Sequence, residues 1–232
     1  MLVLVGALVC GASAWADDPK LKFLKDDDIN AALLLPPPPA DGTDAANAEL
    51  AELQRIAKAT TPERWAQANY DYLHEDGTMF QVAIAPGFDL SQLPATAKLL
   101  SDVRGDEAIF ASRAKNYFKR NRPWIIDPAL KTCSTKEGAQ SSYPSGHATM
   151  AFAMGVVLAK TMPELATQIL ARAKDYSEER LVCGMHYRSD IEGGQTLGSA
   201  VAVLLLRNPD FEADLAAAKA ELTAAHLTGM AN

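Results

Sequence analysis

Three short segments of the 232-residue sequence carry side chains that together could transfer a phosphoryl group without a metal ion. They contain Lys115 and Arg122-Pro123, then Pro144-Ser145-Gly146-His147, then Arg180, His186 and Asp190. Cations can hold phosphate oxygens, a histidine can attack phosphorus or pass a proton, and a carboxylate can orient that histidine. The rest of the chain must supply the elements that bring these segments together.

The run from Pro144 to His147 stands at the start of an apolar segment that reaches Thr161. A helix that begins there would present free N–H groups and the positive end of its dipole, which favours anions. Gly146 lets an anion approach the backbone, Ser145 can donate a hydroxyl hydrogen bond and His147 can hand over a proton. Taken alone, the same residues could form an ordinary turn with a polar histidine beside it.

Lys115 and Arg122 are seven positions apart, so both side chains project from one face near the end of a predicted helix. An arginine can grip two oxygens of one phosphate, and a lysine adds a point charge. Arg113, Lys119 and Arg120 lie alongside, and a solvated basic face is therefore the alternative.

His186 and Asp190 are four positions apart, so the carboxylate could accept a hydrogen bond from one imidazole nitrogen and leave the other unprotonated for attack. A structural His–Asp pair is one alternative. A metal site made of His147, His186 and Asp190 is another. The cations at 115, 122 and 180 argue against a metal, because a bound dication does not need a cage of Lys and Arg. We expect no metal and no cofactor.

The N-terminal sequence and the cysteines indicate an exported protein, periplasmic or secreted. Residues 2–9 are apolar and Ala14-Trp15-Ala16 resembles a signal-peptidase site, although no Lys or Arg precedes the apolar run. We predict a signal peptide over 1–16, an extension with a proline run over 17–40, and a helical domain over 41–232. Cys133 and Cys183 remain after cleavage; an even pair in an exported chain favours a disulfide over two buried thiols.

Composition narrows the fold class and the partners. The net charge of −7 argues against nucleic-acid binding, which depends on neutralising phosphates, and no segment of the mature chain is long enough to span a membrane. Helical periodicity predicts an all-α bundle of about seven to nine helices. The expected helices cover 45–59, 61–74, 90–102, 105–121, 145–161, 163–181, 189–206 and 209–227, and 82–85 is the single strand-like run.

In order, the three segments read Lys-x6-Arg-Pro, Pro-Ser-Gly-His and Arg-x5-His-x3-Asp. This resembles the signature of the phosphatidic-acid phosphatase type 2/vanadium haloperoxidase superfamily. The run Leu-Leu-Pro-Pro-Pro-Pro at 34–39, the cysteines and the exported form are similar to bacterial class A non-specific acid phosphatases. One position departs from the family pattern, because Glu179 stands where a serine usually precedes the arginine. That change replaces a hydroxyl by a carboxylate near the anion site.

The resemblance implies a single-domain helical bundle and a metal-independent acid phosphatase. Its substrates would be small phosphomonoesters such as nucleotides, sugar phosphates and aryl phosphates. The residues leave open whether the chain acts as a monomer or as a homo-oligomer. A vanadium-dependent haloperoxidase and a non-catalytic phosphate-binding protein are the alternative functions.

The resemblance also implies roles for the matching residues. His186 would attack phosphorus to form a phosphohistidine, Asp190 would orient it, and His147 would protonate the leaving oxygen and then activate water. The phosphate oxygens would be held by Lys115, Arg122, Arg180, Ser145 and the N–H of Gly146. An acidic pH optimum is expected, since His147 must be protonated while His186 is not.

Overall fold

The structure, a computed structural model, describes residues 20–85 and 87–228, and in these residues it contains helices and no strand. The α-helices are α1 (Ala31–Leu34), α2 (Asp44–Ala59), α3 (Pro62–Leu73), α4 (Gln81–Ile84), α5 (Pro94–Phe118), α6 (Pro123–Ile126), α7 (Gly146–Thr161), α8 (Ala166–Val182), α9 (Arg188–Leu205) and α10 (Pro209–Ala224). Two 3₁₀ helices cover Gly77–Phe80 and Pro163–Leu165. The predicted all-α class is confirmed. The predicted signal peptide lies outside the described residues.

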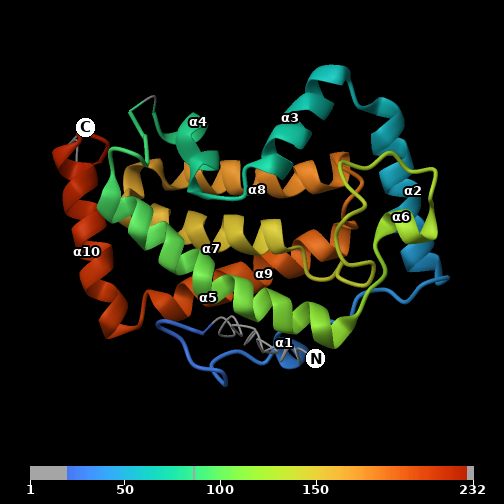
Figure 1. Ribbon diagram of the computed structural model, residues 1–232, viewed down its shortest axis with the longest axis horizontal. Helices are drawn as coiled ribbons and strands as arrows, with labels where there is room; N and C mark the ends of the chain where they lie inside the picture. The colour runs from blue at the N-terminus through green and yellow to red at the C-terminus, as the bar shows by residue number, and fades with distance from the viewer. Residues whose placement is uncertain (1–19, 86, 229–232) are drawn as a thin grey trace, which may run out of the picture.

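Helix α7 occupies the centre of the bundle, with α5, α8 and α9 packed around it (Figure 1). Its sequence is apolar on every side, and such a helix is stable only when neighbouring helices cover it. Its fully buried apolar residues are Ala148, Met150, Ala151, Ala153, Met154, Val157 and Leu158. The other long helices are therefore arranged around the segment that begins with the Pro-Ser-Gly-His run.

Helix α9 approaches α7 closely because two of its glycines face that helix. A Cβ atom on Gly198 would lie 2.2 Å from the carbonyl oxygen of Thr149, and one on Gly194 would lie 2.6 Å from that of Ser145. Side chains at these positions would force the helices apart. The close packing brings the starts of the two helices together, so the N–H of Ser145 donates to the carbonyl of Asp190 at 2.9 Å.

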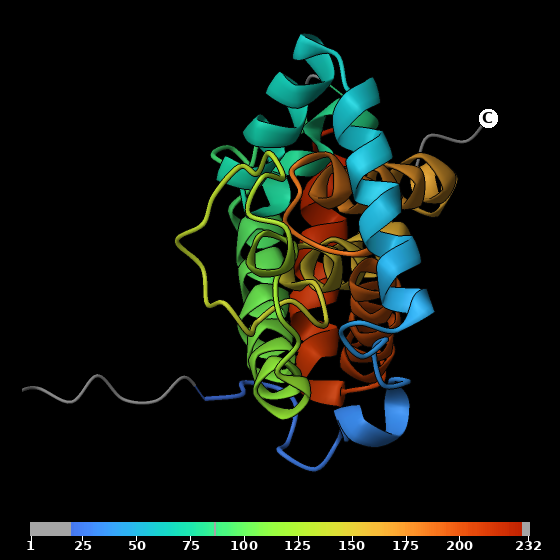
Figure 2. The ribbon, with the colours of Figure 1, turned by 90° about the vertical axis from the view of Figure 1, so that its right-hand side faces the viewer.

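The two ends of the bundle are covered by different helices. Helix α10 packs against α5 at one end, while α2 and α3 pack against α8 at the other (Figure 1). The long loop between α6 and α7, yellow-green in Figure 2, lies at the same end as α2. Thr43 and Thr61 cap the starts of α2 and α3 through their side chains, as expected for these residues ahead of a helix.

Two local predictions were wrong. Helix α5 is continuous where separate helices over 90–102 and 105–121 were expected, because the apolar positions before and after Gly105 stay on one buried face. Burial of that face outweighs the modest cost of one glycine inside a helix. The strand-like run at 82–85 lies almost entirely in α4, since no second strand is available to pair with it in the described residues.

The described part of the predicted extension, residues 20–40, runs beside α5 (Figure 1). Asp106 of α5 accepts hydrogen bonds from the N–H groups of Lys22, Phe23 and Leu24 at 2.6–3.0 Å. The proline run that follows is not helical, and the hydroxyl of Tyr143 donates to its first carbonyl at 2.7 Å. None of the helices described in 20–85 and 87–228 is long and apolar enough to cross a membrane.

Candidate active site

The three predicted segments meet where α7 and α9 begin and where α5 and α8 end. Lys115 lies in the last turn of α5, Arg122 caps α6, Ser145 caps α7 with Gly146 and His147 in its first turn, Arg180 lies in the last turn of α8, and His186 precedes α9 with Asp190 in its first turn. The structure thus brings all eight predicted residues into one region. A helix end offers unpaired backbone groups as well as side chains, which suits a site for a charged ligand.

His186 is held in the tautomer that a nucleophile needs. Its Nε2 lies 2.8 Å from Nη1 of Arg122, and its Nδ1 lies 3.3 Å from Oδ2 of Asp190. Because a guanidinium only donates, Nε2 must be the acceptor and Nδ1 must carry the proton. Burial and the charge of Arg122 lower the pKa of His186 to about 3. Its Nε2 therefore stays unprotonated in acidic solution.

Asp190 is buried and fully engaged. Its Oδ1 lies 2.6 Å from Arg120, while its Oδ2 accepts from the hydroxyl of Ser142 at 2.5 Å and from the N–H of Tyr187 at 2.9 Å. Burial opposes its charge, but the hydrogen bond with His186 and the charge of Arg120 bring the pKa of Asp190 down to about 2. The carboxylate stays ionised and cannot rotate away from the histidine.

Arg120 does not belong to the solvated basic face that was the alternative for this stretch of the sequence. Its side chain is 3% exposed; it pairs with Asp190 on one side and with Glu49 of α2, at 2.6 Å, on the other. It also lies over the ring of Tyr187, 4.1 Å from the centroid. Lys119, directly before it, adopts a left-handed conformation (φ 49°) that turns the chain inward at the end of α5.

Sequence reasoning also missed Ser142 and Glu49. Ser142 stands two residues before the recognised Pro-Ser-Gly-His run, and its proximity to that run was the one available signal. Glu49 lies in α2, far away in the sequence, and its charge is unremarkable there. Only the tertiary structure, which places its carboxylate 2.6 Å from Arg120, identifies it as the second partner of that arginine.

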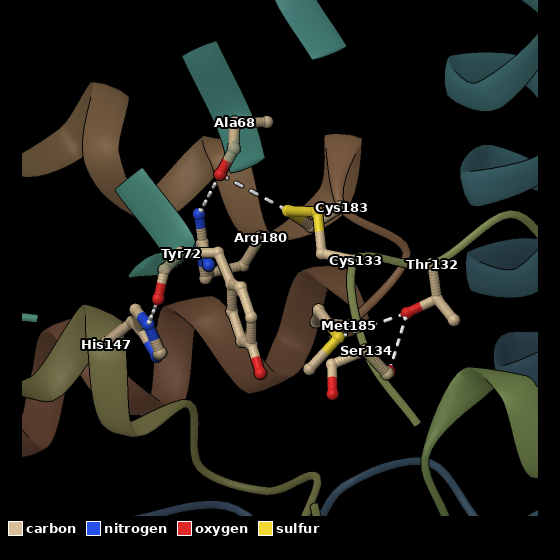
Figure 3. Close-up of a disulfide and its surroundings, with 9 residues drawn as sticks. All are labelled: Ala68, Tyr72, Thr132, Cys133, Ser134, His147, Arg180, Cys183 and Met185. Carbon is tan, nitrogen blue, oxygen red and sulfur yellow. Dashed lines mark hydrogen bonds between the residues drawn. A yellow bond between two sulfur atoms is a disulfide. The ribbon is translucent and has the colours of Figure 1, made fainter. Parts of the chain in front are cut away.

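Arg180 is buried with hydrogen-bond capacity to spare. Its Nη2 donates to the carbonyl of Ala68 at 2.9 Å, as Figure 3 shows. Its Nε and Nη1 have no hydrogen-bond partner among the described residues. Burial lowers the pKa of Arg180, and burial together with the charge of Arg122 lowers the pKa of Lys115 to about 8. A dianion placed between these cations would satisfy their donors and offset their repulsion.

The ring of His147 lies nearly parallel to those of Tyr72 and Tyr176, with centroid distances of 6.0 and 5.8 Å. Its Nε2 is 3.5 Å from the carbonyl of Tyr72, as Figure 3 shows, and its Nδ1 is 3.6 Å from the carboxylate of Glu75. Burial, followed by the charges of Arg180 and His186, holds the pKa of His147 well below its usual range. In the phosphate-free protein, His147 is therefore neutral at mildly acidic pH.

The predicted disulfide is confirmed, since Cys133 and Cys183 are bonded with an S–S distance of 2.08 Å. The bridge joins the loop before α7 to the end of α8, one turn beyond Arg180. Ala68 contacts both the disulfide and Arg180. Its carbonyl oxygen lies 3.3 Å from Sγ of Cys183 and accepts the hydrogen bond from Arg180 (Figure 3). Hydrogen bonding from Thr132 to the sulfur of Met185 adds a second link next to His186.

Glu179, the residue that departs from the family pattern, faces α3. Its carboxylate is 0% exposed and pairs with Arg64 at 3.0 Å, and no hydrogen bond joins it to Arg180 in the described part of the chain. Burial raises the pKa of Glu179 to about 7, and the positive charge of Arg64 only partly opposes this. The departure therefore places a poorly solvated carboxylate behind the cationic residues.

Replacing Glu179 by glutamine is expected to stabilise the protein at pH 8 and to have little effect at pH 4.5. The pKa of Glu179 in the folded protein lies above the ordinary value of 4.5. Its contribution to the free energy of unfolding is therefore fully present below pH 4.5 and is lost as pH rises through about 7. Glutamine does not ionise, so the variant does not lose this contribution. We expect its free energy of unfolding at pH 8 to exceed that of the wild type by about 1–3 kcal/mol. Thermal unfolding at both pH values measures it, and a variant that melts lower at pH 8 would contradict the argument.

The described residues contain no cluster of three or more His, Cys, Asp or Glu side chains arranged to hold a metal ion. In particular, His147 and His186 are each engaged with other partners. His147 faces Tyr72 and Glu75, while His186 faces Arg122 and Asp190. His147, His186 and Asp190 are therefore not arranged as a set of metal ligands in the described part of the chain.

Comparison with known proteins agrees with this geometry. A family model described as the PAP2 superfamily matches residues 100–213, which contain all eight site residues. An acid phosphatase of Zymomonas mobilis is 35% identical, and the match covers 84% of this chain and 77% of that enzyme. A non-specific acid phosphatase of Providencia stuartii is 32% identical, and the match covers 88% of this chain and 85% of that enzyme.

Solved structures share the fold. A bacterial vanadium-dependent iodoperoxidase superposes with a TM-score of 0.59 at 19% identity, over 77% of this chain and 53% of its own. LpxE from Aquifex aeolicus superposes with a TM-score of 0.55 at 21% identity, over 68% of this chain and 94% of LpxE. At such low sequence identity, these two structures are evidence for the fold alone. The two phosphatases, in contrast, are similar in sequence over most of their length. The chain therefore belongs to the PAP2 superfamily and, within it, to the non-specific acid phosphatases.

Proposed function

We propose that this acid phosphatase hydrolyses small phosphomonoesters through a phosphohistidine at His186. The observation that carries the proposal is the state of that residue: Nε2 is unprotonated, buried and 2.8 Å from Arg122, while Asp190 holds the proton on Nδ1. Nε2 attacks phosphorus as the bond to the ester oxygen breaks, and His147 gives its proton to the departing oxygen. Water then attacks the phosphohistidine, His147 takes the water's proton, and the P–N bond breaks to release phosphate and His186.

The negative charge that develops on the phosphoryl oxygens is balanced by fixed positive groups. Arg122, Arg180 and Lys115 supply the full charges, and the first N–H groups of α7 at Gly146 supply the helix dipole. Ser145 accepts the N–H of Ala148 at 3.4 Å through its hydroxyl oxygen, which leaves its hydrogen free to donate to phosphate. Phosphoryl transfer depends mainly on such positioning and charge stabilisation, and here protein cations take the part that Mg²⁺ plays elsewhere.

Substrate binding sets the protonation of His147. Without phosphate its pKa is held low by burial, Arg180 and His186. A phosphate dianion among the cations offsets most of their charge and favours the protonated imidazole that the first step needs. The Lys115 ammonium, whose pKa is about 8, loses its charge in alkaline solution. Both effects favour acidic over alkaline pH.

Export to the periplasm or beyond is part of the proposal, supported by the apolar N-terminal run and by the Cys133–Cys183 bridge, since disulfides persist in oxidising compartments. Small substrates such as nucleotides, sugar phosphates or aryl phosphates are proposed because the residues that hold phosphate recognise the group these compounds share.

Phosphate release from p-nitrophenyl phosphate in excess EDTA, followed from pH 3 to 9, tests the proposal. We expect turnover that survives the chelator, is greatest in acid and declines as pH passes about 8, where Lys115 loses its charge. Activity abolished by EDTA and restored by a divalent metal would overturn the metal-free mechanism. A flat profile across the range would contradict the paired roles of His147 and His186.

A further inference from the structure

Glu137, in the loop before α7, forms an ion pair with the guanidinium of Arg122, which we propose to bind phosphate. Nη2 of Arg122 forms an ion pair with Oε2 of Glu137, and the hydroxyl of Ser141 lies 3.2 Å from the same nitrogen. Nη1 of Arg122 is bound to His186 and to the carbonyl of Met185. Both terminal nitrogens of Arg122 are therefore engaged by the protein itself, although an arginine binds phosphate through these same groups.

The loop that carries Glu137 is anchored on both sides of it to segments of the site. On one side Cys133 is bonded to Cys183, and its N–H donates to the carbonyl of Cys183 at 3.0 Å. On the other side the N–H of Arg122 donates to the carbonyl of Ala139 at 2.8 Å. These anchors hold Glu137 close to Arg122, so the contact is built into the loop and does not depend on a freely moving surface chain.

Exposure shows that Glu137 is on the solvent side of this pair. The Arg122 side chain is 0% exposed and His186 is 2% exposed, whereas the Glu137 side chain is 31% exposed. The charge of Glu137 also acts on the other two cations. Burial lowers the pKa of both Lys115 and Arg180, and Arg122 lowers that of Lys115 further, whereas Glu137 raises both pKa values. One carboxylate thus acts on all three cationic side chains that would hold phosphate.

We propose that Glu137 is an internal competitor of the phosphoryl group, and that it sets the affinity of the site by leaving Arg122 when substrate binds. A buried guanidinium is costly without a counter-ion, and Glu137 supplies one while the site is empty of substrate. Two anions cannot share that guanidinium without repulsion, so part of the phosphate-binding energy is used to displace Glu137. The inference rests on the proposed function, because it requires that Arg122 binds phosphate.

The experiment compares the dissociation constant of inorganic phosphate, by calorimetry at pH 6, for the wild type, Glu137→Gln and Glu137→Ala. Glutamine keeps the size of the side chain and removes its charge, while alanine removes the competing group. We expect both variants to bind phosphate about three- to tenfold more tightly, the size expected for releasing one partly exposed ion pair. Their melting temperatures without phosphate should fall, and their stabilisation by added phosphate should increase.

Asp214→Asn is the matched control. Its carboxylate is 26% exposed and pairs with Lys98 at 2.6 Å, but it lies in α10, at the opposite end of the bundle (Figure 1). Its loss should leave phosphate binding unchanged. Equal or weaker phosphate binding by both Glu137 variants would overturn the inference, since Glu137 would then be a structural support of Arg122. A wild type that hydrolyses p-nitrophenyl phosphate while Glu137 has no effect would overturn only the inference; a wild type that neither binds phosphate nor turns over would overturn the proposed function as well.

Discussion

His186→Ala is expected to lower kcat for p-nitrophenyl phosphate by at least about 10⁴-fold, because no other described side chain has an unprotonated nitrogen held between Arg122 and Asp190. Alanine removes the covalent route, and water would have to attack the ester directly. Binding should persist, since Arg122, Arg180 and Lys115 remain. The variant should therefore still bind inorganic phosphate while it turns over almost no substrate.

Rapid quenching in alkali with ³²P-labelled substrate measures the intermediate directly. The wild type should carry acid-labile, base-stable label, and His186→Ala should carry none. His226→Asn is the control, because His226 is an exposed histidine in a left-handed conformation (φ 57°) that asparagine tolerates. Label that persists in His186→Ala, or turnover within tenfold of the wild type, would assign the nucleophile to another residue.

Asp190→Asn is expected to lower kcat by about 10²–10⁴-fold with a smaller change in KM, because it changes the tautomer of His186. Asp190 accepts through Oδ2 from Ser142, Tyr187 and His186 at once. An amide in its place presents donors where the carboxylate presented acceptors, and the imidazole then moves its proton to Nε2. The nitrogen that should attack loses its electron pair.

Steady-state kinetics at pH 5 and a proton NMR spectrum of the histidine ring N–H groups test this expectation. Ser142→Ala serves as the graded control: it removes one neutral donor from Asp190 and should cost about tenfold or less in kcat. Asp190→Asn with unchanged kcat would show that the carboxylate has no part in preparing the nucleophile. Arg120 should not be used as the control, since it touches Asp190 directly.

The local sequence was enough to predict most helices and to single out the candidate site residues that the fold brings together. Pro, Gly, Thr and Ser at helix boundaries act within a few residues, so α2, α3, α7 and α10 begin within one residue of the predicted positions. The spacing of Lys115, Arg122, His186 and Asp190 suits the chemistry that we propose for each pair. Prediction failed at α4 and at the break in α5, where packing against other helices outweighs the local preference.

Only the tertiary structure decided which charges surround these residues. Arg120, between α5 and α6, pairs with both Glu49 of α2 and Asp190 of α9, and Glu137 reaches Arg122 from a loop. Nothing in their sequence neighbourhood distinguishes them from solvated charges. Their role depends on burial and on distances of a few Å across the bundle, because Coulomb interactions become strong only where packing excludes water. The sequence by itself therefore determined the candidate reacting groups, and the fold decided their protonation and their partners.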